Sequence, residues 1–154
     1  MIQKFSSLFV LVFIFAVPFA MPQEARETGK VFPPQAVIIA AYRGDVEMLK
    51  QILATNPDKD VRDALGATAL HAAMYQSNIQ VVKLLLENGF DPNARDTNNN
   101  YTPLHYAVTA NNLDYARLLL QYGANKSAKG LDKLTPLDKA RKEEKKEMAS
   151  LLYR

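Results

Sequence analysis

Short apolar segments with helical spacing occur in pairs along most of the chain. Between residues 37 and 53, apolar residues return every three or four positions on either side of a charged break at 43–45. Residues 79–88 carry a wide apolar face, and residues 102–109 and 113–121 repeat the arrangement. Apolar positions at this spacing predict amphipathic helices with one buried face. The pattern therefore predicts an all-α chain built from pairs of short helices.

The helix pairs are copies of one unit. The tetrapeptides at 68–71, 102–105 and 135–138 read Thr-Ala-Leu-His, Thr-Pro-Leu-His and Thr-Pro-Leu-Asp, and they are 34 and 33 residues apart. Gly89 and Gly123, which are expected to end the second helices, follow the same period. The third copy has one extra residue in its opening turn, so we expect a longer loop there. A period of this length predicts a stacked array in which each unit packs on its neighbours.

The first and last units depart from the other two. Residues 35–62 keep the register of the helix pair but lack the opening turn and the Thr-x-Leu-His sequence. Residues 130–154 carry a mixed charge run at 141–147. A terminal repeat has a neighbour on one side only, so a polar outer side keeps the stack soluble. We therefore interpret this run as the solvated face of a capping unit and favour that over a docking patch.

These motifs resemble the ankyrin repeat, in which a turn, Thr-Pro-Leu-His-x-Ala, a helix pair and a closing Gly-Ala-Asp-x-Asn recur. The resemblance implies an all-α ankyrin-repeat solenoid of about four helix-pair repeats over residues 35–154. These are a truncated N-terminal repeat, two full repeats and a polar C-terminal capping repeat, at about 35–62, 63–95, 96–129 and 130–154. The Gly-His pair usual between the two helices is absent, and asparagine, which tolerates left-handed backbone, stands there in two repeats.

The first twenty residues differ from the rest. One lysine precedes an apolar run at 8–17, which is short beside the roughly 20 residues that span a bilayer. We interpret residues 1–20 as a signal peptide and not a membrane anchor, with cleavage after Ala20 or, alternatively, after Ala25. Residues 21–34 are expected to be a flexible linker. The mature protein is then expected to be exported, to a bacterial periplasm or secreted, without stable membrane insertion.

Composition excludes several classes of function. The 154 residues carry a formal net charge of +3, or +2 without the first twenty. Lysine and arginine alternate with acids instead of forming the concentrated basic face that nucleic-acid binding needs. The chain has no cysteine, so it holds no disulfide, thiol nucleophile or cysteine-ligated metal. We expect a monomer with no cofactor and no nucleic-acid partner.

The two histidines, His71 and His105, occupy the same position of successive repeats. Adjacent helices lie about 8–10 Å apart, whereas the ligands of one zinc each lie about 2.1 Å from the metal. We therefore expect each histidine to bond a neighbouring turn and not to bind metal; Asp138, at the third copy, keeps hydrogen-bonding capacity. No serine, histidine and acid constellation and no phosphate-binding glycine loop stands out. Neither catalysis nor a metal site is predicted.

The candidate binding residues lie at positions that the repeat geometry exposes but whose amino-acid identity the repeat motif does not fix. By resemblance, ankyrin proteins bind partners with their turn tips and with the concave face of their first helices. Tyrosine and arginine are enriched among interface hot spots. Two of the candidate tyrosines share a register and form either an exposed aromatic stripe or packing against the adjacent turn. The candidates are Tyr42, Arg43, Arg62, Leu65, Tyr75, Gln76, Arg95, Asn98, Asn99 and Tyr101.

The sequence is therefore interpreted as that of a non-catalytic module that binds another protein and scaffolds or protects it. A rigid stack would present its binding face with little ordering cost. The alternative is an exported effector that binds a host protein with the same face. An enzyme with this packing would require titratable residues that converge in a cleft.

Overall fold

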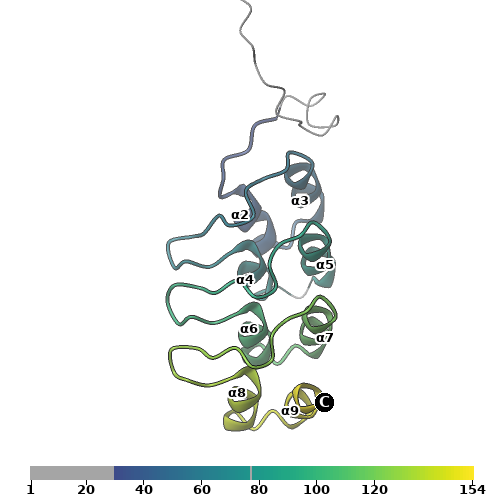
Figure 1. The fold of residues 1–154 in the computed structure, drawn as a ribbon. Helices are drawn as coiled ribbons and strands as arrows, with labels where there is room; N and C mark the ends of the chain where they lie inside the picture. Colours follow the sequence, from purple (N-terminus) through teal and green to yellow (C-terminus); the bar gives the residue numbers. More distant parts are fainter. Residues whose placement is uncertain (1–29, 77) are drawn as a thin grey trace, which may run out of the picture.

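The computed structural model describes residues 30–76 and 78–154 (Figure 1). This part of the chain contains helices and turns and no strand, which confirms the predicted all-α solenoid. The expected signal peptide and residues 21–29 of the expected linker lie outside the described residues. Among the described residues, no helix is long and apolar enough to cross a membrane. The helices are α2 (Ala36–Arg43), α3 (Val46–Leu53), α4 (Ala69–Ala73), α5 (Ile79–Glu87), α6 (Pro103–Thr109), α7 (Leu113–Gln121), α8 (Pro136–Lys142) and α9 (Lys146–Tyr153).

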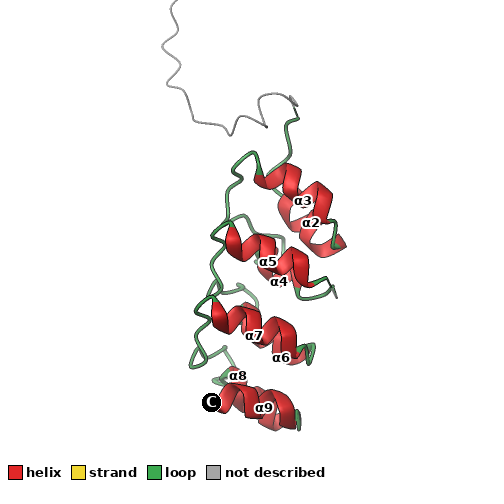
Figure 2. Ribbon diagram, turned by 90° about the vertical axis from the view of Figure 1, so that its right-hand side faces the viewer, coloured by secondary structure: helices red, strands yellow, loops and turns green. Residues whose placement is uncertain are grey.

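The helices form two parallel columns. Figure 1 shows α2, α4, α6 and α8 stacked in one column and α3, α5, α7 and α9 in the other, and each helix contacts the next one in its column. The turns that join successive pairs project from the same side of the stack. Figure 2 shows the second column from its outer side, with the helices of each pair lying close together. The turns and the first helices therefore share one continuous surface.

The short link between the helices of a pair is repeated in detail. Asp45, Asn78 and Asn112 share one register, and each side-chain oxygen accepts a backbone N–H of the helix that follows, at 2.9, 3.1 and 3.0 Å. These are N-caps, which satisfy donors that the first helical turn leaves unpaired. The residue before the cap is left-handed at Gly44 (φ 70°) and at Asn111 (φ 51°). Asparagine thus replaces glycine at this turn, as predicted.

The core follows the two columns. Both columns contribute aliphatic side chains to it, and the buried alanines are concentrated in the first helices. At 84–86, two of the predicted core leucines are buried and Leu84 is half-buried; at 118–120, Leu119 is buried and its neighbours are half-buried. Alanine has the highest helix propensity, which suits helices of only five to eight residues. Buried core residues include Ala40, Ala41, Ala72, Ala73, Ala107, Ala140, Leu49, Ile52, Val82, Leu85, Leu119, Met148 and Leu152.

His71 and His105 tie each first helix to the following turn. His71 Nδ1 accepts the backbone N–H of Thr68 at 3.2 Å, so Nε2 carries the ring proton and donates to the backbone oxygen of Tyr101 at 3.0 Å. His105 makes the equivalent contacts at 3.1 and 3.3 Å. Both rings are fully buried, and desolvation lowers the pKa of each below its ordinary value. The histidines are therefore structural, as predicted.

The opening turn of the third repeat is longer than its equivalents. Asp63 N–H donates to the oxygen of Ala67, whereas Asp96 N–H donates to that of Tyr101, one residue further along. Asn100 takes the left-handed conformation inside this turn, with φ 57°. The inserted residue lengthens the turn, as expected.

Candidate protein-binding groove

Two tyrosines from neighbouring repeats lie side by side on the surface of the first column. Tyr42 is in α2 and Tyr75 follows α4, and their ring centroids are 6.0 Å apart with planes tilted by 55°. The residues are 54% and 64% exposed. Of the two arrangements that the sequence leaves open, this is the exposed aromatic stripe.

The stripe continues into the third repeat. Tyr106 in α6 meets Tyr75 edge to face, with centroids 5.9 Å apart, and meets Tyr101 of the longer turn in the same way at 6.5 Å. Such pairs contribute about 0.5–1.5 kcal/mol beyond the burial of their area, so the rings hold one another in place. We call Tyr42, Tyr75, Tyr106 and Tyr101 the tyrosine groove.

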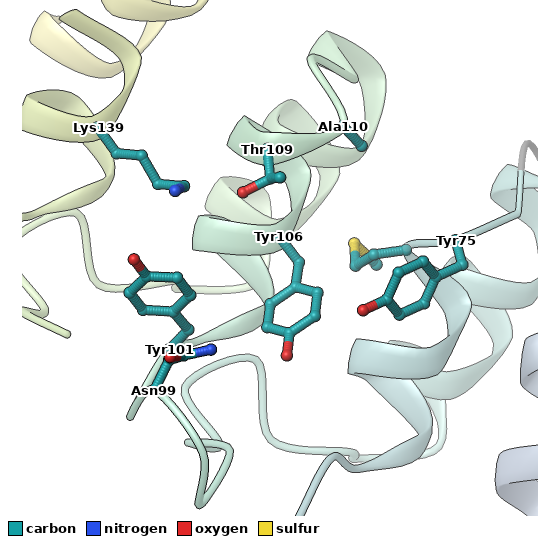
Figure 3. Close-up of a pocket in the computed structure, with 8 residues that line it drawn as sticks. Tyr75, Asn99, Tyr101, Tyr106, Thr109, Ala110 and Lys139 are labelled. Atoms are coloured by element: carbon teal, nitrogen blue, oxygen red, sulfur yellow. The ribbon is translucent and has the colours of Figure 1, made fainter. Parts of the chain in front are cut away.

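A pocket of about 420 Å³ opens within the tyrosine groove. This volume lies within the roughly 300–1,000 Å³ typical of ligand pockets. Figure 3 shows Tyr106 between Tyr75 and Tyr101, with Lys139 reaching toward Tyr101 from α8. The pocket therefore joins three repeats. Its lining residues are Met74, Tyr75, Asn99, Tyr101, Tyr106, Thr109, Ala110 and Lys139.

The buried carboxylate of Asp96 fixes the hydroxyl of Tyr106. This hydroxyl donates to Asp96 Oδ2 at 3.0 Å, and Asp96 Oδ1 accepts the backbone N–H of Asn99 at 2.6 Å. The ring also packs edge to face on His71, with centroids 5.1 Å apart. Desolvation, together with the hydrogen bond to Asp96, raises the pKa of Tyr106 well above its ordinary value. The hydroxyl therefore stays protonated and fixed in direction.

Tyr101 is fixed on the other side of the pocket. Its ring stacks on His105 with centroids 4.8 Å apart, and its hydroxyl donates to Asp132 at 2.5 Å. Lys139 Nζ lies 5.1 Å from the Tyr101 centroid and 2.9 Å from Glu143 Oε1. Burial lowers the pKa of Lys139, but its contacts with Glu143 outweigh this and leave the pKa raised. The ammonium of Lys139 thus stays protonated at the pocket wall, where it is paired with Glu143.

Two of the predicted binding residues make structural contacts. Arg62 Nη1 donates to the backbone oxygens of Gly66 and Arg95, at 2.8 and 2.6 Å. Arg95 Nη1 donates in the same way to Asn100 and Lys129, at 3.0 and 2.8 Å. Each guanidinium therefore closes its own turn and ties it to the next one. These two side chains hold the turns in register beside the groove.

Of the other predicted residues, Tyr42, Tyr75 and Tyr101 belong to the groove itself, and the rest do not line the pocket, apart from Asn99. Arg43 is exposed next to Tyr42, Leu65 is 65% exposed at the second turn, and Asn98 is exposed at the longer turn. The backbone oxygen of Gln76 accepts the hydroxyl of Tyr115, and its side chain is half-exposed. The sequence candidates inside the pocket are Tyr75, Asn99 and Tyr101.

Sequence reasoning missed Met74, Tyr106, Thr109, Ala110 and Lys139. Tyr106 is the variable residue of Thr-Pro-Leu-His-x-Ala, and Lys139 is the same position one repeat later. That position is free in the motif, which is the signal that could have identified both. The register that Tyr42 and Tyr75 share leads to Thr109 in the third repeat, and Tyr106 lies about one helical turn before it.

The described residues hold no group of three histidine, aspartate or glutamate side chains placed to bind a metal ion. In the same part of the chain, the side chains of both histidines are occupied by the contacts between turns. What the groove offers is aromatic surface, one cation and a few amide and hydroxyl groups.

The sequence matches the family described as ankyrin repeats (3 copies) over residues 36–130. The chain belongs to the ankyrin-repeat family. Ankyrin repeats generally mediate protein–protein interaction, and the fold is typically non-catalytic. The tyrosine groove is an aromatic stretch of the surface that the turns and first helices of these repeats form.

Several curated proteins share the repeats but are much longer. The chain is 41% identical over 64 residues to potassium channel AKT1 of Arabidopsis thaliana, covering 42% of this chain and 7% of the channel. It is 40% identical over 63 residues to L-asparaginase of Dirofilaria immitis, covering 41% and 11%. It is 39% identical over 64 residues to the mitochondrial liver isoform of glutaminase of Mus musculus, covering 40% and 11%. The likeness to the two enzymes lies in their ankyrin part.

Proposed function

We propose that the protein is a non-catalytic binding module that holds a partner protein in the tyrosine groove and scaffolds or protects it. The observation that carries this proposal is the run of four tyrosines, from three repeats, whose rings contact one another at 5.9–6.5 Å. Rigid aromatic side chains supply large contact areas at low conformational cost, and tyrosine is enriched among hot spots. The contacts within the groove preorganise it.

The proposed contact surface is the groove with its neighbours. Tyr42, Tyr75, Tyr106 and Tyr101 supply the centre, while Arg43, Gln76, Asn98 and Asn99 supply a polar rim to which Leu65 adds one apolar side chain. Arg62 and Arg95 contribute through the turns that they hold. A polar rim around a central apolar anchor is the usual anatomy of a protein–protein interface.

The proposed place of action is outside the cytoplasm, in a bacterial periplasm or after secretion. Support comes from the signal-like apolar run at 8–17. The alternative role, an effector that binds a host protein, uses the same surface in another location. Fractionation of cells that make the protein tests this: recovery in the cytoplasm alone would overturn the proposed export.

The proposed surface is tested by site-specific photo-crosslinking. Benzoylphenylalanine replaces Tyr75, inside the groove, or Tyr122, which follows α7 in the second column and is 39% exposed. We expect position 75 to form a discrete covalent adduct with the partner protein, and excess unmodified protein should suppress this adduct by competing for the partner. Position 122 should form no such adduct. Equal adducts at both positions, or none at position 75, would remove the groove from the proposal.

A further inference from the structure

The turn beside the tyrosine groove offers little free backbone to an incoming strand. The oxygen of Tyr101 accepts both His71 Nε2 and the N–H of Asp96. The oxygen of Asn99 accepts the N–H of Leu131. A partner segment that binds by extending a sheet needs a row of unpaired backbone groups. This surface must therefore recognise its ligand mainly with side chains.

The rings of the groove are set at steep angles to one another. Neighbouring planes meet at 55° between Tyr42 and Tyr75, 83° between Tyr75 and Tyr106 and 87° between Tyr106 and Tyr101. No two neighbouring tyrosine rings of the groove are stacked in parallel, so the rings do not form one flat surface. A compact aliphatic ring can pack between aromatic rings set at such angles, and the pocket of about 420 Å³ beside Tyr106 provides the space for it.

The charge at the pocket argues against a cationic ligand. Aromatic surfaces attract lysine, arginine and quaternary ammonium groups, but here Lys139 Nζ already lies 5.1 Å from the Tyr101 centroid. Glu143 pairs with this ammonium at 2.9 Å, which also reduces its pull on an anion. A neutral ligand with hydrogen-bond acceptors fits best, because Lys139 and the Asn99 amide can both donate to it.

We propose that the tyrosine groove binds a proline-rich, extended segment of the partner protein, with a proline ring in the pocket between Tyr75, Tyr106 and Tyr101. Polyproline II segments have no internal hydrogen bonds and present their carbonyl oxygens outward. They dock on aromatic-lined grooves at low ordering cost, since the ligand is already extended. This inference rests on the proposed function and names the chemistry of the segment that is bound.

NMR of the full chain with isotope-labelled tyrosine tests this proposal with synthetic peptides. Decaproline is titrated against three probes of the same length: a glycine-serine peptide, a proline peptide with alternate lysines, and an amphipathic helical peptide. We expect decaproline to shift the ring signals of Tyr75, Tyr101 and Tyr106 and to leave Tyr153, which is 75% exposed at the end of α9, unchanged. Tyr75→Ala, at an exposed position, should weaken this binding about tenfold or more, and Tyr106→Leu should do the same.

Several results would overturn the inference. They are no shift with decaproline, an equal shift with the glycine-serine peptide, or tighter binding of the lysine-bearing or helical peptide. The chain has a Pro-Pro sequence of its own at Pro33 and Pro34, just before α2. If the ring signals shift with protein concentration in the absence of peptide, and if Pro33→Ala with Pro34→Ala removes this shift, the groove would be assigned to a second copy of the chain. The crosslinking experiment does not use these peptides, so a specific adduct at position 75 with no proline binding would leave the proposed function standing.

Discussion

The guanidinium of Arg62 donates a 2.6 Å hydrogen bond to the backbone oxygen of Arg95, 33 residues further along the chain. Arg95 makes the same contact with the turn that follows it. Residues that the repeat pattern leaves free can thus hold the array together. The turns are linked in series by guanidinium groups on their exposed side and by imidazole groups on their buried side.

Removal of one guanidinium should loosen this series. Each arginine donates two hydrogen bonds to backbone oxygens, and bonds from a charged donor contribute about 1.5–3 kcal/mol when buried and less at the surface. We expect Arg95→Ala, at a half-buried position, to lower the free energy of unfolding by about 1–2 kcal/mol in urea titrations. Arg43→Ala is the matched control and should change it by less than about 0.5 kcal/mol. Equal effects from the two variants would contradict the structural role.

Stability should fall as the pH drops below about 6.5. Burial lowers the pKa of His71 and His105 in the folded chain, so the unfolded chain takes up protons first. The linkage then destabilises the fold by up to about 1.4 kcal/mol per pH unit for each histidine. Denaturant titrations between pH 7.5 and 5 measure this slope. Above pH 6.5 the histidines are neutral in both the folded and the unfolded chain, so their full contribution to the free energy of unfolding is present there. A slope that is unchanged in His71→Gln would contradict the assignment to that ring.

Lys133 should be a position where glycine stabilises the fold. Its φ of 65° lies in the left-handed region, and the equivalent residue of the second repeat is Gly66, with φ 71°. A residue with a β-carbon is strained by about 1–2 kcal/mol in this conformation. Glycine avoids the strain, but its more flexible backbone loses more conformational entropy on folding, which cancels part of the gain. We expect Lys133→Gly to raise the melting temperature, consistent with a gain of about 0.5–1 kcal/mol. Lys133→Ala, which removes the same charge but keeps the β-carbon, should not raise it.

Lys145 should stabilise the contact between the third and fourth repeats. Its Nζ donates to the backbone oxygens of Val108 and Thr109 at 2.7 and 2.8 Å, at the C-terminus of α6. A cation there satisfies unpaired carbonyl groups and interacts favourably with the helix dipole. We expect Lys145→Met to lower the free energy of unfolding by about 1–2 kcal/mol. Lys146→Met, at the exposed neighbouring residue, is the control, and a loss of the same size there would argue against the contact.

The repeat spacing predicted the fold because each copy restates the same physical requirements. The glycine stops and the histidine contacts follow from positions compared at 33 or 34 residues, whereas the caps at Asn78 and Asn112 are seen only in the structure. The longer third turn was predictable for the same reason, since one inserted residue must lengthen the loop and leave the helices unchanged.

The tyrosine groove could be predicted only in part. The shared register of Tyr42 and Tyr75 indicated their proximity, but Tyr106 joins them from a different position of the repeat. Its direction depends on Asp96, ten residues earlier, and on the packing against His71. The role of the arginines could not be predicted either, because a bond between a side chain and a backbone oxygen of the next repeat depends on how far the turns lie apart.

Asp96 connects the two regions that the proposed interface uses. One carboxylate holds Tyr106, at the centre of the groove, and the backbone of Asn99, at the tip of the longer turn. A ligand at the tip that displaces Asp96 would therefore also move Tyr106, and this would couple contact with the tip to occupation of the pocket. By thermodynamic reciprocity, a ligand that fixes the tip changes the affinity of the groove by the same factor as a ligand in the groove changes that of the tip. The third repeat would thus respond to a partner as one cooperative unit.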